Sequence, residues 1–147
     1  RNNIRVHIKI SDIYKNDSLY KKISSAISHK FDFVDSGNMH LCIKQSSIKN
    51  EDINALYKNL ARYIKSLKCN LSIYRISKEQ IDIRTYENGV GETLSCGSAS
   101  LAVASLCIKD KCRVKSSGGA LDFIKKNNDT MEMIGPAEFV FSGSFDD

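Results

Sequence analysis

The sequence predicts an α+β fold in which a curved, mostly antiparallel, barrel-like sheet wraps around one central helix. Two observations support this prediction. Most apolar segments are short and alternate apolar with polar side chains, which is typical of strands that bury one face. Residues 101–108, in contrast, are small and apolar throughout, which predicts a helix that is buried on every side. Strands must therefore surround this helix.

The chain of 147 residues is predicted to form a single domain, residues 1–147, because this length suffices for one real core. It contains neither the ~18 consecutive apolar residues of a membrane span nor a signal peptide, so no membrane partner is expected. The net charge of +5 comes from scattered lysines rather than a basic patch interleaved with aromatics, so no nucleic acid partner is expected. Because the chain begins with Arg1 rather than Met, we expect a fragment of a longer protein.

The chain has five cysteines, an odd number that argues against a disulfide framework. They are Cys42, Cys69, Cys96, Cys107 and Cys112. Without a secretory context, free thiols in a reducing cytosol are expected, which predicts a cytoplasmic protein. Zinc sites need closely paired ligands. The nearest pair, Cys107 and Cys112, has neither that spacing nor a histidine beside it, so no metal site is predicted.

The first two segments of the chain differ in how clearly they predict structure. Residues 4–10 alternate apolar and polar positions and predict a half-buried strand. Residues 16–30 are mostly polar, with Leu19, Ile23 and Ile27 at four-residue spacing. That pattern is compatible with a short surface helix or with a loop, and both remain open.

Residues 31–34 and 41–44 predict two strand pieces that flank a turn at residues 35–40. His40 would then lie at the start of the second strand piece. A single histidine in such a place is usually structural, so the pattern by itself assigns no role to it.

The clearest helix is predicted for residues 51–67, with Asn50 as its cap. Its apolar stripe consists of Ile53, Leu56, Tyr57, Leu60, Ile64 and Leu67, which indicates ordinary core packing. Residues 71–76 and 80–86 predict a hairpin that turns around residues 77–79. After the central helix, short strands are predicted at residues 112–115, 121–125, 131–134 and 139–141, with turns at residues 118–119 and 127–129.

The densest run of chemically useful groups lies in residues 86–100, between a predicted strand and the central helix. A glycine-rich turn there places Cys96 at the start of the helix, where unpaired N–H groups and about half a positive charge gather. The amides of Gly97 and Ser98 can therefore hold a carboxylate, and a thiol in this position is expected to ionise readily. Such a thiol suits proton transfer beside a carboxylate or nucleophilic attack. A cysteine in front of an apolar helix is also often just a small buried residue.

Three motifs, in order along the chain, resemble those of the diaminopimelate epimerases. They are Val-Asp-Ser-Gly-Asn-Met-His at residues 34–40, Glu-Asn-Gly-Val-Gly-Glu-Thr-Leu-Ser-Cys-Gly-Ser at residues 87–98, and Gly-Pro-Ala-Glu-Phe-Val-Phe at residues 135–141. The resemblance implies an isomerase that needs no pyridoxal phosphate or other cofactor and interconverts LL- and meso-diaminopimelate in lysine and peptidoglycan precursor synthesis. It also implies the fold, because in that family two half-barrels, each around a central helix, face each other across the active site.

In the mechanism implied by the resemblance, two thiols flank the α-carbon of the substrate, and one removes a proton while the other delivers one. Cys96 matches the thiol of the second half, with Glu87 and His40 beside it as catalytic residues. The substrate-binding positions that the resemblance implies are Asn38, Asn70, Glu87, Asn88, Gly97 and Ser98.

The sequence departs from the family pattern in three places. Asn88 stands where an arginine usually holds the remote carboxylate of the substrate, and Met39 stands where proline is usual. The third departure is that the partner thiol, in its own Cys-Gly-Asn motif, is missing. The chain therefore matches the C-terminal half of a two-domain epimerase and is expected to be inactive without the missing N-terminal half.

Two further expectations follow from these departures. Two copies of the chain are expected to be able to associate as a homodimer, as the two natural halves do. The alternatives to a diaminopimelate epimerase are a related cofactor-independent racemase with another substrate, which Asn88 keeps open, and a non-catalytic folded half that acts as a binding module.

Overall fold

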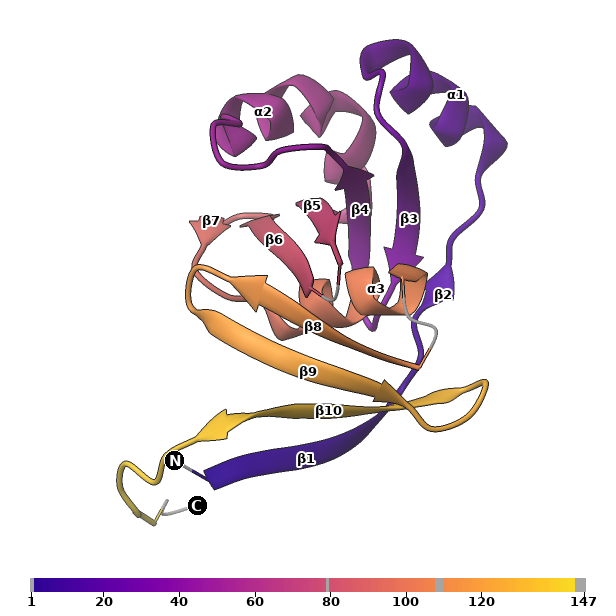
Figure 1. The fold of residues 1–147 in the computed structure, drawn as a ribbon. Coiled ribbons are helices and arrows are strands. Elements are labelled where there is room, and N and C mark those ends of the chain that lie inside the picture. Colours follow the sequence, from indigo (N-terminus) through magenta and orange to yellow (C-terminus); the bar gives the residue numbers. More distant parts are fainter. Residues whose placement is uncertain (1, 79, 108–109, 145–147) are drawn as a thin grey trace.

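The computed structural model describes residues 2–78, 80–107 and 110–144, and the strands among them form one curled sheet (Figure 1). The strands are β1 (Asn2–Lys9), β2 (Asp12–Ile13), β3 (Phe31–Asp35), β4 (Met39–Lys44), β5 (Asn70–Ser77), β6 (Gln80–Glu87), β7 (Gly91–Thr93), β8 (Lys111–Ser116), β9 (Gly119–Lys125) and β10 (Thr130–Ala137). The helices are α1 (Asp17–Ala26), α2 (Ile53–Ile64), which a short 3₁₀ turn (Lys65–Leu67) extends, and α3 (Gly97–Cys107). The strand order is β1-β10-β9-β8-β6-β5-β4-β3-β2, and β7 pairs with β6 outside this path.

Two parallel pairs interrupt an otherwise antiparallel sheet. Strand β4 runs parallel to β5, and β6 runs parallel to β8, while the other pairs between described strands are antiparallel. Parallel neighbours cannot be joined by a tight turn and need a crossover. Helix α2 lies in the first crossover and α3 in the second. The sheet curls around α3 (Figure 1), so the predicted α+β class, with a mostly antiparallel sheet around a central helix, is confirmed.

The sheet separates two apolar cores. Because successive side chains of a strand point to opposite faces, Phe33 and Leu41 lie in the core beneath α1 and α2, whereas Val34 and Cys42 lie in the core around α3. These four side chains are fully buried. Complete burial of a large hydrophobic side chain contributes about 1.5–3 kcal/mol to stability. Strands β3, β4 and β5 therefore lie between the two cores.

Side-chain caps define where the two outer helices begin. Asn16 Oδ1 accepts a hydrogen bond of 3.0 Å from the backbone N–H of Leu19, so the segment that was compatible with helix or loop forms α1. Helix α2 is capped by Asp52, whose Oδ1 accepts from the N–H of Ala55 at 3.0 Å. The predicted cap Asn50 is therefore wrong, because the helix begins two residues later than the predicted boundary.

The strand predicted at residues 139–141 is wrong. Strand β10 ends at Ala137, which pairs with Asn2 at the start of β1. Beyond that point no described strand offers hydrogen-bond partners, and the chain leaves the sheet. Phe139 and Phe141 are accordingly 86% and 80% exposed.

The predicted strand at residues 4–10 forms, but only one end of it is half-buried. Ile8 and Ile10 pack against the core around α3. Ile4 and Val6 are 54% and 42% exposed, because β1 is an edge strand that reaches beyond the core. Three predictions fall outside the described residues: Arg1 as the chain start, Glu79 in the hairpin turn, and Ile108 as the end of the central helix.

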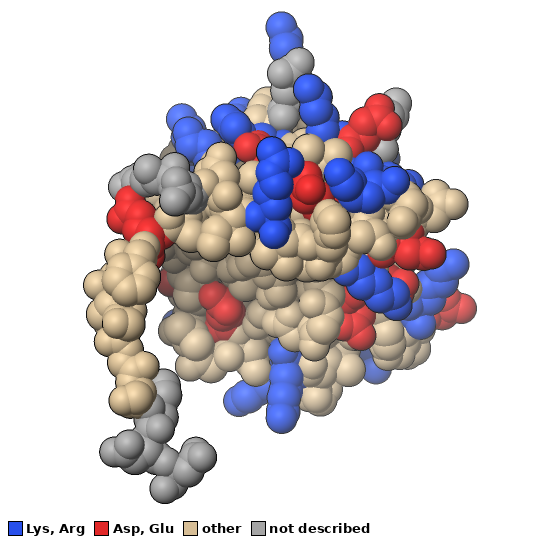
Figure 2. All heavy atoms as spheres, turned by 90° about the horizontal axis from the view of Figure 1, so that it is seen from below, with Lys and Arg blue, Asp and Glu red and all other residues tan. Residues whose placement is uncertain are grey.

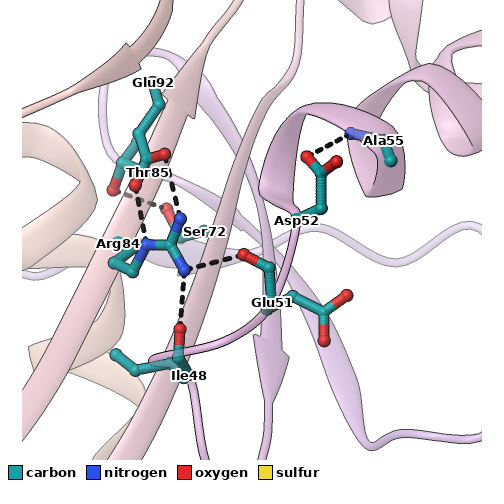
Figure 3. A network of polar contacts seen from close by, with 8 residues as sticks. All are labelled: Ile48, Glu51, Asp52, Ala55, Ser72, Arg84, Thr85 and Glu92. Carbon is teal, nitrogen blue, oxygen red and sulfur yellow. Dashed lines mark hydrogen bonds and ion pairs between the residues drawn. The ribbon is translucent and has the colours of Figure 1, made fainter.

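Arg84 on β6 joins two segments that are far apart in the sequence (Figure 3). Its Nε and Nη2 donate to the two carboxylate oxygens of Glu92 on β7, at 2.6 and 2.9 Å. Its Nη1 donates to the backbone carbonyls of Ile48 and Glu51, at 2.7 and 2.8 Å. One planar guanidinium therefore fastens both the β6–β7 hairpin and the segment that leads into α2.

Replacing Arg84 with Gln is expected to lower the free energy of unfolding by about 1–3 kcal/mol, because Glu92 and two carbonyls lose their donors. Urea unfolding followed by circular dichroism measures this loss. Arg113 is the matched control, because it makes the same two-bond contact with Asp122 but its side chain is 57% exposed, against 21% for Arg84. An equal loss in Arg113→Gln would contradict the role given to Arg84.

Charged side chains are spread over the surface. On the face shown in Figure 2, Lys and Arg side chains are interspersed with Asp and Glu. Several charged side chains of the described residues form ion pairs, such as Arg113 with Asp122 at 2.7 Å and Arg5 with Glu132 at 2.9 Å. No helix in the described ranges is long and apolar enough to cross a membrane.

Candidate functional site

The β6–β7 hairpin delivers the thiol of Cys96 to the beginning of α3. Gly89 and Gly91 turn the chain with φ angles of +85° and +109°, which side chains other than glycine rarely tolerate. The carbonyl of Cys96 accepts the first hydrogen bond of the helix, from the N–H of Ser100 at 3.0 Å. Cys96 is half-buried. The predicted position of this thiol at a helix N-terminus is therefore confirmed.

Gly118 holds the segment before the thiol in place. Its N–H donates to the carbonyl of Leu94 at 2.7 Å. A Cβ atom at this position would lie 3.0 Å from that carbonyl oxygen and 3.0 Å from Cβ of Ser95. A side chain at this position would therefore crowd the segment before the thiol. The sequence indicated a turn at residues 118–119 but carried no signal that the turn touches the thiol segment.

A chain of polar contacts links Cys96 to His40. Cys96 Sγ lies 3.4 Å from Ser98 Oγ, and Ser98 Oγ lies 3.1 Å from His40 Nε2. His40 Nε2 also lies 3.2 Å from Asn38 Oδ1. Ser36 donates its hydroxyl to the carbonyl of Ser98 at 3.1 Å, which fastens the turn before β4 to the first turn of α3. Residues from two segments that are far apart in the sequence, 36–40 and 96–98, thus meet at the thiol.

His40 is neutral at physiological pH. It is fully buried on β4, and this burial lowers its pKa to about 4, against smaller opposing effects of Glu87 and Asp35. Because Nε2 faces the amide oxygen of Asn38, an acceptor, we assign the single ring proton to Nε2. His40 then donates from Nε2, and the hydroxyl proton of Ser98 is free to point at the sulfur of Cys96.

Glu87 lies at the end of β6, next to this chain of contacts. Its Oε1 accepts a hydrogen bond of 2.6 Å from the hydroxyl of Thr93 on β7. Its negative charge opposes the fall in the pKa of His40, which places it close to that ring. Thr93 lies within residues 86–100, but the sequence pattern there predicted no role for its hydroxyl.

A second group of contacts surrounds Asn70 and Asn88. Asn70 Oδ1 accepts from the backbone N–H of Asn88 at 2.9 Å. Asn88 Oδ1 accepts from the hydroxyl of Tyr57 at 2.7 Å. Because Asn70 pairs with His40 across the parallel β4 and β5 strands, the two groups are neighbours. Tyr57 was predicted only as a member of the apolar stripe of α2, so the sequence missed this role.

The structure therefore brings the candidate residues together at one edge of the sheet, where β4 and β5 begin and β6 ends. The catalytic and substrate-binding candidates there are Asn38, His40, Asn70, Glu87, Asn88, Cys96, Gly97 and Ser98. Gly97 and Ser98 occupy the first turn of α3, where backbone amides have no acceptor within the helix. These candidates thus combine one thiol, several neutral donors and one carboxylate.

The other four thiols are unsuited to join Cys96. Burial raises the pKa of Cys69 and of Cys112 to about 12, and raises the pKa of Cys42 and Cys107 as well. Cys42 and Cys69 are completely buried. Cys107 lies at the far end of α3, about 16 Å along the helix from Cys96. No second reactive thiol lies at this edge within the part of the chain that the structure describes.

Neither a metal cluster nor the surface cavity described below coincides with this site in the described residues. In the described ranges, no three His, Cys, Asp or Glu side chains gather as metal ligands would. A cavity of about 450 Å³ lies near the other end of β5 and β6. Its lining consists of Ser47, Ile48, Lys49, Arg75, Gln80, Asp82, Ile83, Arg84, Lys115, Ser116 and Ser117, and it includes none of the candidate residues. The candidate site is therefore separate from this cavity and is defined by its contacts.

Comparisons with known proteins agree with the sequence motifs. No protein-family model matches the chain. A diaminopimelate epimerase from Buchnera aphidicola subsp. Acyrthosiphon pisum (strain 5A) is 34% identical over 97% of this chain and 56% of its own length. One from Chelativorans sp. (strain BNC1) is 39% identical over 54% of this chain and 29% of its own length. The chain thus spans about half the length of the first of these relatives.

A solved structure shares the fold. The phenazine biosynthesis PhzC/PhzF-type protein from Clostridium difficile (strain 630) superposes with a TM-score of 0.59 over 99% of this chain and 58% of its own chain. The two sequences are 15% identical, so this likeness concerns the fold alone.

Proposed function

This chain is a relative of the diaminopimelate epimerases over nearly its whole length, and from that premise we propose that it supplies one thiol of a two-thiol proton-transfer site that acts on diaminopimelate. The observation that carries the proposal is the placement of Cys96 at the N-terminus of α3, in contact with Ser98 and through it with His40. The reaction class is isomerisation at the carbon that bears the amino and carboxylate groups.

The proposed chemistry is a balanced exchange of one proton. The thiolate of Cys96 takes the α-proton and becomes a thiol, and the electron pair of the broken C–H bond stays on the substrate. The amides of Gly97 and Ser98 hold the substrate carboxylate, onto which this charge spreads. A second thiol then protonates the opposite face and becomes a thiolate. No cofactor takes part in these steps.

The second thiol is proposed to come from the part of the relatives' length that this sequence does not span. Cys42 and Cys69 are buried, and burial raises the pKa of all four other thiols, which supports this proposal. The chain by itself is therefore proposed to be inactive in epimerisation. The exposed apolar side chains of Ile4, Val6, Phe139, Val140 and Phe141 favour a protein partner on that surface, either the missing half or a second copy of the chain.

The neighbouring residues are proposed to support the thiol and hold the substrate. The hydroxyl of Ser98 donates to the thiolate, and neutral His40 fixes that hydroxyl without adding charge. The carboxylate of Glu87 is proposed to accept a hydrogen bond from the substrate ammonium group. Asn38, Asn70 and Asn88 present amide groups to the rest of the substrate. The uncharged side chain of Asn88 also favours the second candidate, a related racemase with another substrate.

Protection of Cys96 from alkylation tests this proposal. Diaminopimelate at about ten times its dissociation constant is expected to slow the reaction of Cys96 with iodoacetamide about tenfold, because the bound ligand covers the sulfur. Mass spectrometry of peptides gives the rate for each cysteine separately. Cys112 serves as the internal control, since it lies outside the site and its rate is expected to stay constant. Equal rates for Cys96 with and without ligand would refute the proposal.

A further inference from the structure

The hydrogen bond between Tyr57 and Asn88 fixes which way the Asn88 side-chain amide faces. The Tyr57 hydroxyl lies 2.7 Å from Asn88 Oδ1, a distance typical of O–H···O and shorter than the usual N–H···O separation. The amide oxygen therefore faces Tyr57, and Nδ2 with its two protons faces the other way.

Tyr57 is itself held rigidly. Its side chain is 7% exposed on α2, and its ring stacks on that of Tyr86 with centroids 3.9 Å apart. Burial raises the pKa of its hydroxyl, which therefore stays protonated and remains a donor. Because the donor cannot move far, the amide of Asn88 cannot rotate freely.

Asn70 is oriented in the same sense. Its Oδ1 accepts from the backbone N–H of Asn88 at 2.9 Å, and the residue is 5% exposed. Within the described ranges, no residue accepts a hydrogen bond from Nδ2 of Asn70 or of Asn88. Both amides therefore have their oxygen engaged by the protein and their two N–H donors available to a ligand.

These donors lie next to the thiol site. Asn70 pairs with His40 across neighbouring strands, which are about 4.8 Å apart, and His40 contacts Ser98 beside Cys96. A ligand whose reacting carbon lies at the thiol can therefore place its other end at Asn70 and Asn88. The side chains of Tyr57, Asn70 and Asn88 are all uncharged.

We propose that Tyr57 is a specificity-determining positioning residue, which locks Asn88 so that the end of the ligand remote from the thiol is recognised as a hydrogen-bond acceptor and not by its charge. This inference rests on the proposed function and deepens it. The ligand class is an α-amino acid with a remote carbonyl group. The dissociation constants of a ligand with a remote carboxamide and of one with a remote carboxylate are expected to differ by less than about tenfold, since neutral donors discriminate weakly between these groups.

The test compares diaminopimelate with its monoamide, in which the remote carboxylate is a carboxamide. For each, the concentration that halves the alkylation rate of Cys96 is measured, and the side-chain NH₂ signals of Asn70 and Asn88 are followed by NMR. In the native chain both compounds are expected to protect Cys96 within about tenfold of each other and to shift both NH₂ signals.

The informative variant is Tyr57→Phe, which keeps the ring stacked on Tyr86 and removes only the hydroxyl. The freed Asn88 amide can then turn its oxygen toward the ligand, which attracts the N–H groups of a carboxamide and repels a carboxylate. The preference is expected to move toward the monoamide by at least about threefold, roughly the effect of one weak hydrogen bond. Tyr63→Phe on the same helix is the control and is expected to change neither concentration.

The outcomes separate the two proposals. If both compounds protect Cys96 and Tyr57→Phe weakens them in equal proportion, the role of Tyr57 is overturned while the proposed function stands, since a merely structural defect moves both affinities together. If neither compound protects Cys96 in the native chain, the proposed function is overturned and the inference about Tyr57 falls with it.

Discussion

Replacing Cys96 with Ser is expected to slow the exchange of the α-proton of diaminopimelate with solvent by several orders of magnitude. The chain by itself should incorporate deuterium at the α-carbon of one stereoisomer without inverting it, because a single thiol reaches only one face of that carbon. A serine hydroxyl is a far weaker acid than a thiol and supplies no base at neutral pH. We expect the exchange rate to fall by about 10²–10⁴-fold, the usual contribution of a positioned base.

Deuterium incorporation measured by NMR in D₂O quantifies this loss, and chiral chromatography of the same samples follows inversion. Cys112→Ser is the matched control, because it removes a thiol outside the site and should leave the exchange rate unchanged. Persistent exchange in Cys96→Ser would show that another group is the base. Rapid inversion by the native chain would contradict the proposal that a second thiol has to be supplied from elsewhere.

Acidification is expected to destabilise the protein through His40. Its pKa is about 4 in the folded protein and 6.5 when exposed, so between these values the unfolded chain binds a proton that the folded chain does not. Stability from this group is therefore complete above about pH 7.5 and falls as the pH decreases. The expected loss is about 2 kcal/mol by pH 5 and about 3 kcal/mol by pH 4.

Urea unfolding at a series of pH values between 7.5 and 5 measures this dependence, in a range above the titration of most carboxylates. In His40→Gln, which cannot take up the proton, the curve is expected to be nearly flat over that range. His29→Gln at an exposed position should keep the native slope. A native slope retained in His40→Gln would assign the effect to another group.

The periodicity of the sequence predicted most elements and missed their ends. The strands that contain Phe33, Leu41 and Ile73 lie where the sequence predicted them, but they bury side chains on both faces because the sheet lies between two cores. The cap of α2 was misplaced from Asp52 to Asn50, because both residues are good caps and only the first turn of the folded helix selects one. The strand predicted at residues 139–141 failed because a strand needs a partner, and the described pairing of β1 with β10 ends at Asn2 and Ala137.

The sequence by itself determined the class of fold, the apolar central helix and the stretch that presents Cys96 at its N-terminus. These features depend on residues close together in the chain, where burial and turn geometry leave a regular pattern. Only the tertiary structure decided that Ser98 lies between Cys96 and His40, and that Tyr57 locks Asn88. His40 and Ser98 are 58 residues apart and Tyr57 and Asn88 are 31 apart, so strand register and helix packing set these contacts, and neither leaves a local signature in the sequence.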